Sequence, residues 1–202
     1  TGVRADVDAV TAELHRHGAL AFWDYAAAAP YVRIDMNPVV RGADAALVYK
    51  DAVFVSPHKL LGGPGSPGLL LAKKHLFKRG GVHARSSTPG GGTVFFVSAD
   101  QHRFVREVQH REEGGTPDIL GSIRASLAFQ LKHAVGVRAI ERRCDELVAL
   151  AAHRWRAVPN LLPLGAPLHA AAAGERLPIL SFMVRCGDTL LHHNFVCALL
   201  ND

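Results

Sequence analysis

The sequence predicts an α/β protein, because segments typical of buried strands and segments typical of helices both recur along its 202 residues. Two predicted strands end in polar side chains, the first in Asp24 and the second in Ser-Pro-His-Lys at residues 56–59. A glycine- and proline-rich loop follows the second cluster directly. Strand ends that open into such loops are where α/β proteins place their chemistry, so these two positions are the first candidates for a functional site.

The predicted helices are recognised by their apolar periodicity and by the residues that end them. The first has Val7, Val10 and Leu14 on one face and stops at Gly18. Gly136 separates two longer helices. We expect helices over residues 6–17, 118–135, 137–157 and 190–200.

The predicted strands are short apolar segments, several of them bounded by glycine, proline or charged residues. We expect strands over residues 19–23, 52–55, 68–72, 93–98 and 177–186. Residues 31–51 and 159–176 have no regular pattern, and residues 80–92 predict a mobile loop because glycines bracket them.

The composition is that of a folded globular protein, with 49% hydrophobic and 20% charged residues. The length allows one sizeable core, or one domain with part of another. The net charge is +5, but the densest basic group, residues 138–143, alternates with apolar positions on a predicted helix. A solvated helix face explains this group better than a nucleic-acid interface does. No apolar segment approaches the length of a membrane span, so we expect neither nucleic acid nor membrane as a partner.

Three cysteines, Cys144, Cys186 and Cys197, are odd in number and widely spaced. This spacing fits neither a disulfide framework nor a zinc-binding motif, and the paired histidines lack the spacing and acidic neighbours of a metal site. We therefore expect reduced thiols, no bound metal and a cytoplasmic location.

The cluster at residues 56–59 offers a hydroxyl, an imidazole and an amine within four residues. A lysine at the end of a strand can act as a nucleophile toward carbonyl compounds. The cluster is not a phosphate-binding P-loop, because Lys59 precedes the glycines and no Gly-Lys-Ser/Thr closes the loop. The plainer interpretation, a strand that ends in a solvated lysine before a turn, stays open on this motif alone.

Three motifs occur in a fixed order: Asp24 after a strand, Ser-x-His-Lys after a later strand, and Glu113-Gly-Gly-Thr116-Pro117 before a long helix. Together they resemble the class V aminotransferases of fold type I, the pyridoxal-phosphate enzymes that include cysteine desulfurases and selenocysteine lyases. The resemblance runs from the first predicted helix to the strand near Ser181.

The resemblance implies a three-layer α/β sandwich with a mostly parallel sheet. Residues 1–135 would be the central part of the cofactor-binding large domain, and residues 136–202 a connecting helix and the beginning of the small C-terminal domain. The strands ending at Trp23 and Val55 would lie close together and bring Asp24 and Lys59 to opposite sides of one pocket. We expect the chain to be a fragment of a longer protein.

The same resemblance implies a role for each site residue. Lys59 would form the internal aldimine with pyridoxal 5'-phosphate, and Asp24 would pair with the pyridine nitrogen. Ser56 and His58 would bind the cofactor phosphate. Thr116 would reach the phosphate of the neighbouring subunit's cofactor, which makes the site a property of a homodimer. Plainer interpretations remain: a turn or capping aspartate, a core histidine, and a threonine that precedes a helix.

The chain also departs from the family pattern. Ala27 stands where many members have a glutamine, and none of the three cysteines lies in the expected catalytic loop. By resemblance, the ring-stacking residue and first phosphate loop would precede Thr1, and the carboxylate-binding arginine would follow Asp202. We therefore expect this chain to lack the cofactor and to be inactive.

The expected function is that of a pyridoxal-phosphate-dependent enzyme of amino-acid metabolism with an amino-acid substrate. The choice between an aminotransferase and a cysteine desulfurase or lyase stays open. The alternative is a non-catalytic interaction or regulatory module that retains the fold.

Overall fold

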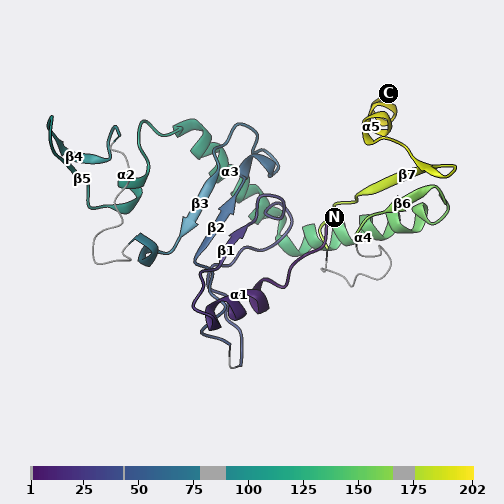
Figure 1. Ribbon diagram of the computed structural model, residues 1–202, viewed down its shortest axis with the longest axis horizontal. Coiled ribbons are helices and arrows are strands. Elements are labelled where there is room, and N and C mark those ends of the chain that lie inside the picture. Colours follow the sequence, from purple (N-terminus) through teal and green to yellow (C-terminus); the bar gives the residue numbers. More distant parts are fainter. Residues whose placement is uncertain (1, 43, 78–89, 166–175) are drawn as a thin grey trace. The chain divides into compact units, whose positions relative to one another are not determined.

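The computed structural model describes residues 2–42, 44–77, 90–165 and 176–202 (Figure 1). By its contacts the chain divides into two compact units. The larger unit comprises residues 8–30 and 34–132, and the smaller comprises residues 1–7, 31–33 and 133–202.

A three-stranded sheet organises the larger unit, with strand order β1-β2-β3 (Figure 1). The strands are β1 (Phe22–Asp24), β2 (Ala52–Val55) and β3 (Leu69–Ala72). β1 runs parallel to β2, and β3 runs antiparallel to it. The central strand is the most buried of the three, and Val53 is 0% exposed. Its β-branched residues suit a buried central strand, which explains why residues 52–55 were predictable.

Helix α1 (Val7–Arg16) contacts β1 through a polar pair. The Trp23 indole Nε1–H donates to Thr11 Oγ1 over 2.8 Å, and Thr11 is fully buried. This hydrogen bond satisfies a hydroxyl that would be costly to bury alone.

The rest of the larger unit consists of short elements followed by one long helix. These elements are η1 (Pro57–Lys59), η2 (Lys74–Phe77), β4 (Val94–Val97), β5 (His102–Phe104), α2 (Val108–Glu112) and α3 (Ile119–Val135), of which the last three residues belong to the smaller unit. β4 and β5 form an antiparallel hairpin of their own. Asp118 caps α3, because its Oδ1 accepts the Gly121 N–H over 2.8 Å.

The smaller unit contains a long helix, a second three-stranded sheet and a final helix. Its elements are α4 (Val137–Trp155), β6 (Leu161–Pro163), β7 (Phe182–Cys186), β8 (Thr189–Leu190) and α5 (His193–Asn201). The strands are antiparallel in the order β6-β7-β8. The rings of Trp155 and Phe182 meet edge to face, with centroids 5.2 Å apart. Gly136, at φ 86°, separates α3 from α4 as the sequence predicts.

The α/β class is confirmed, and the strands ending at Trp23 and Val55 do lie side by side. The mostly parallel, three-layer sandwich is not confirmed. Among the described residues β1–β2 is the one parallel pair, and the other paired strands are antiparallel. The physical reason at β3 is its connection, because the loop after β2 contains a single 3₁₀ turn and no crossover helix.

Two further expectations fall partly outside the described residues. Only residues 90–92 of the predicted mobile loop are described, and residues 166–175 of the predicted irregular segment are not. The assignment of residues 1–135 and 136–202 to a large and a small domain stays a prediction. Within the described ranges, no helix is long and apolar enough to cross a membrane.

Candidate functional site

The parallel pairing of β1 and β2 places two of the predicted motifs at the same sheet edge. Asp24 is the last residue of β1 and lies opposite Phe54, near the end of β2. The Tyr25 N–H donates to the Phe54 carbonyl over 2.8 Å, so the pairing continues to the strand end. Because the carboxyl ends of parallel strands meet at one edge, Asp24 and the Ser56–Lys59 segment face the same region. Asp24 and Lys59 are exposed there.

A tight turn after β1 orients the Asp24 carboxylate. Its Oδ1 accepts the Ala26 N–H over 2.6 Å. The Tyr25 carbonyl accepts the N–H of Ala28 over 3.1 Å and that of Ala29 over 2.7 Å. Tyr25 and Ala29 are buried, which anchors both ends of the turn. Asp24 therefore has the local role expected of a turn aspartate, and this leaves its second oxygen available for a further partner.

The loop after β2 is closely folded around Lys59. The Lys59 N–H donates to the Ser56 carbonyl over 3.0 Å. A Cβ at Gly63 would lie 1.9 Å from the Pro57 carbonyl oxygen, so only glycine fits this position. The Ser66 hydroxyl is buried and donates to the Gly63 carbonyl over 2.6 Å. These contacts fix the backbone that carries Lys59.

The remaining side chains of this motif are accessible to differing degrees. Ser56 is half-buried, whereas His58 is exposed. The exposure of His58 in this chain contradicts its interpretation as a core histidine.

The third motif is joined to the glycine-rich loop at residues 90–92. The Gly115 N–H donates to the Gly91 carbonyl over 2.8 Å. Thr93 is 2% exposed, and its hydroxyl hydrogen-bonds both the N–H and the carbonyl of Gly90. Thr116 follows this junction and is exposed. The structure thus brings together two glycine-bearing segments that the sequence presents separately.

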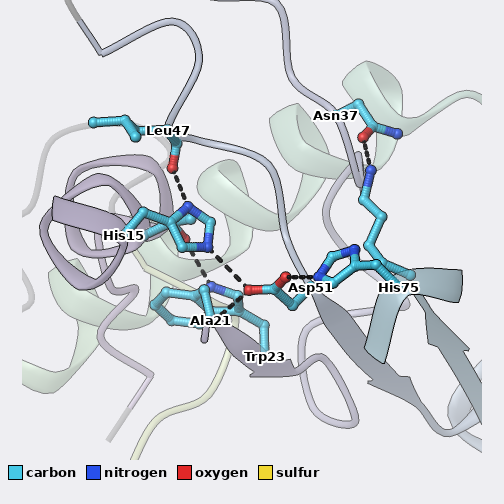
Figure 2. Close-up of polar contacts among 9 residues, drawn as sticks. His15, Ala21, Trp23, Asn37, Leu47, Asp51 and His75 are labelled. Carbon is cyan, nitrogen blue, oxygen red and sulfur yellow. Dashed lines mark hydrogen bonds and ion pairs between the residues drawn. The ribbon is translucent and has the colours of Figure 1, made fainter. Parts of the chain in front are cut away.

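A buried charged cluster lies at the other end of β2, where sequence reasoning did not expect one (Figure 2). Asp51 is 0% exposed and directly precedes β2. Its Oδ2 accepts the Ala21 N–H over 2.8 Å and lies 2.9 Å from His15 Nε2. Its Oδ1 lies 3.1 Å from His75 Nε2, as an ion pair outside hydrogen-bond geometry. An aspartate beside a buried strand was the one local signal for this cluster.

The electrostatics of Asp51 follow from these contacts. Burial raises the pKa of its carboxyl, but the hydrogen bonds from His15 and the Ala21 N–H, with the charges of His15 and His75, outweigh this and hold the pKa below its usual value. The other His15 nitrogen, Nδ1, lies 2.6 Å from the Leu47 carbonyl oxygen. Through these contacts the cluster links α1 and η2 to the residue that precedes β2.

Comparison with known proteins identifies the family of this fold. The family model for class-V aminotransferases matches residues 1–196, so the chain belongs to that family. A probable cysteine desulfurase of Halalkalibacterium halodurans is 33% identical over 152 residues, which cover 75% of this chain and 34% of that protein. A probable cysteine desulfurase of Staphylococcus aureus (strain Mu50) is 28% identical over 152 residues, covering 75% of this chain and 33% of that protein.

Solved structures agree on the fold. The apo cysteine desulfurase of Thermococcus onnurineus NA1 has a TM-score of 0.73 at 22% identity, covering all of this chain and 44% of that one. A cysteine desulfurase of Escherichia coli has the same TM-score and identity, covering 97% of this chain and 42% of that one. The chain thus spans about a third of the length of the curated relatives that it matches.

Proposed function

We propose that the whole protein is a pyridoxal-phosphate-dependent enzyme that acts on an amino acid, and that this chain supplies one side of its cofactor site. The observation that carries the proposal is the parallel β1–β2 pair, which puts a carboxylate and a primary amine at one sheet edge. Membership of the class-V aminotransferase family, whose members generally use this cofactor, supports the same conclusion.

The side chains present fit the chemistry of the cofactor. Bound pyridoxal phosphate supplies an aldehyde and a ring that accepts electrons. Lys59 offers the amine for the aldehyde, and its Nζ can carry a proton to and from the substrate Cα. Asp24 offers a carboxylate to hold the proton on the pyridine nitrogen. Ser56 and His58 offer a hydroxyl and an imidazole donor for the phosphate.

Thr116 belongs to a different part of the proposal. We propose that it reaches the phosphate of the cofactor in a second subunit of a homodimer. Its exposure and its place in the loop between α2 and α3, beside the Gly91–Gly115 junction, support a role in contacts with a second subunit.

The wider architecture is also part of the proposal. In the whole protein, β1–β3 would belong to a larger, mostly parallel sheet of a three-layer large domain over residues 1–135, and residues 136–202 would begin the small domain. The match to structures more than twice as long supports this arrangement.

The printed names of the relatives make L-cysteine the first substrate to test. A desulfurase cleaves the Cβ–S bond of cysteine and yields alanine, whereas an aminotransferase yields the corresponding keto acid. Analysis of the products from full-length protein, cysteine and a keto-acid acceptor separates the two reactions.

The cofactor assignment has a direct test. Full-length protein incubated with pyridoxal phosphate and reduced with borohydride should carry the cofactor covalently on the peptide that contains Lys59, as located by mass spectrometry. Lys59→Ala should lose this label, and Lys74→Ala, a substitution in the same unit but away from the site, should keep it. A label retained in Lys59→Ala would overturn the assignment.

A further inference from the structure

Helix α3 is in contact with both loops that follow the paired strands β1 and β2. Its buried face consists of the small residues Gly121, Ala125 and Ala128, which allow a close approach to neighbouring segments. Two basic residues on the same helix, Arg124 and Lys132, donate hydrogen bonds to main-chain carbonyls of these loops. They are eight residues apart, which corresponds to about 12 Å along the helix axis.

Lys132 holds the turn that orients Asp24. Its Nζ donates to the Ala29 carbonyl over 2.5 Å, in a part-buried contact between residues 103 positions apart in the sequence. Ala29 is fully buried and closes the turn through its own N–H to the Tyr25 carbonyl. A charged donor makes a stronger hydrogen bond than a neutral one, so this contact fixes the far end of the turn.

Arg124 holds the loop that follows Lys59. Its Nη1 donates to the Pro64 carbonyl over 3.1 Å, across 60 positions of sequence. The guanidinium also lies directly against the backbone of the next residue, since a Cβ added to Gly65 would lie 2.3 Å from Arg124 Nη1. One helical turn after Ala128, Leu131 also approaches the loop, since an added Cβ on Gly62 would lie 4.0 Å from its Cδ2.

From these contacts we infer that Arg124 and Lys132 are positioning residues, which hold the Lys59 loop and the Asp24 turn in a fixed relation through one rigid helix. An effect of these contacts on cofactor binding rests on the proposed function, in which Lys59 and Asp24 hold the same cofactor from opposite sides of its ring. The positioning of the two loops by α3 does not depend on the proposed function, because it follows from the contacts of Arg124 and Lys132 alone. Neither residue needs to touch the cofactor.

Amide hydrogen exchange on full-length protein without cofactor tests the positioning directly. Lys132→Met keeps the side-chain length and removes the charged donor, so exchange at Ala26, Ala28 and Ala29 should rise about tenfold. Arg124→Met should raise exchange by about the same factor at Gly63 and Ser66 instead. Lys132→Arg, which keeps a charged donor, should restore protection of the turn.

The matched control is Gln130→Met, an exposed position on the same helix. It should leave exchange in both loops unchanged, which excludes a general effect of methionine on α3. If Lys132→Met and Arg124→Met leave both loops as protected as in the unsubstituted protein, the positioning role is wrong.

Cofactor affinity of the full-length variants gives the second readout. Each methionine substitution at Arg124 or Lys132 should weaken pyridoxal-phosphate binding about tenfold, while borohydride still labels Lys59. Unaltered affinity in both variants, with loosened loops, would overturn the link to the site. If the unsubstituted protein fails to bind the cofactor at all, the proposed function falls, and the exchange pattern still decides whether α3 positions the loops.

Discussion

Asp51 places a negative charge in the interior of the larger unit, and its hydrogen bonds make that charge favourable to the fold. Its pKa is lowered in the folded chain, although burial alone would raise it. The stabilisation is therefore present above the pKa of an unfolded aspartate, about 4, and is lost as the pH falls through the folded pKa. The free energy of unfolding, measured by urea denaturation, should decrease as the pH is lowered from about 5.

A substitution isolates this contribution. Asp51→Asn should lower the free energy of unfolding near pH 7 by about 2 kcal/mol, because the buried carboxylate that accepts hydrogen bonds from His15 and the Ala21 N–H is replaced by a neutral amide. It should also flatten the decrease at acidic pH. A variant with the same acid dependence as the unsubstituted chain would show that other carboxyl groups cause it.

Asp24 accepts a hydrogen bond within the turn after β1, and its proposed role is to pair with the pyridine nitrogen of the cofactor. In full-length protein, Asp24→Ala should retain part of the cofactor affinity but lower turnover of cysteine by roughly a hundredfold or more, because the ring nitrogen loses its partner. Steady-state kinetics and a cofactor titration measure the two effects. Asp100→Ala, at an exposed position, serves as the control. Equal losses in affinity and rate would indicate that Asp24 only shapes the turn.

At the scale of elements, the sequence predicted the helices and strands that their own residues determine, and it missed those that depend on contacts with other segments. β2 and the two long helices were predicted closely, because an apolar β-branched run and a long periodic segment determine them. The strands β5, β6 and β8 and the helix α2 were missed. All four elements are short, and each strand exists through its pairing with a neighbour. A strand of two or three residues is too short for its pairing to leave a periodic pattern in the sequence.

The same difference separates the residues of the candidate site that the sequence revealed from those that only the structure reveals. The motifs around Asp24 and Lys59 could be found because their residues lie at the end of a strand or shortly after one. The supports from Arg124 and Lys132 could not, because they act on carbonyls 60 and 103 residues away. A backbone acceptor has no side-chain signature, so only the structure reveals such contacts.

The loop that carries Lys59 can adopt its observed backbone only with a glycine at position 63. Gly63→Ala would place a methyl group 1.9 Å from the Pro57 carbonyl oxygen, so the backbone must shift. We expect a loss of about 2 kcal/mol in unfolding free energy and weaker labelling of Lys59 in full-length protein. Gly68→Ala is the matched control, since its methyl group would meet an ordinary contact of 3.9 Å to Val55. Equal effects of the two substitutions would contradict the argument.

At the scale of the whole molecule, the two compact units contribute unequally to the proposed chemistry. All five predicted site residues, Asp24, Ser56, His58, Lys59 and Thr116, lie in the larger unit. Four of them are exposed and Ser56 is half-buried. Side chains this open surround no ligand by themselves, since cofactor sites usually bury most of a ligand's surface.

The last prediction follows from this openness and concerns the 202-residue chain by itself. In the proposed whole protein, the ring-stacking residue, the first phosphate loop and the carboxylate-binding arginine would be supplied from outside these residues, and a second subunit would add a phosphate contact. Each missing contact contributes about 1 kcal/mol or more, so several together should weaken cofactor binding by at least about a hundredfold relative to full-length protein. Titration of both proteins with pyridoxal phosphate, followed by the visible absorbance of the bound form, measures the ratio. Stoichiometric binding by the isolated chain, with the affinity of the full-length protein, would mean that β1, β2 and α3 already hold a complete site.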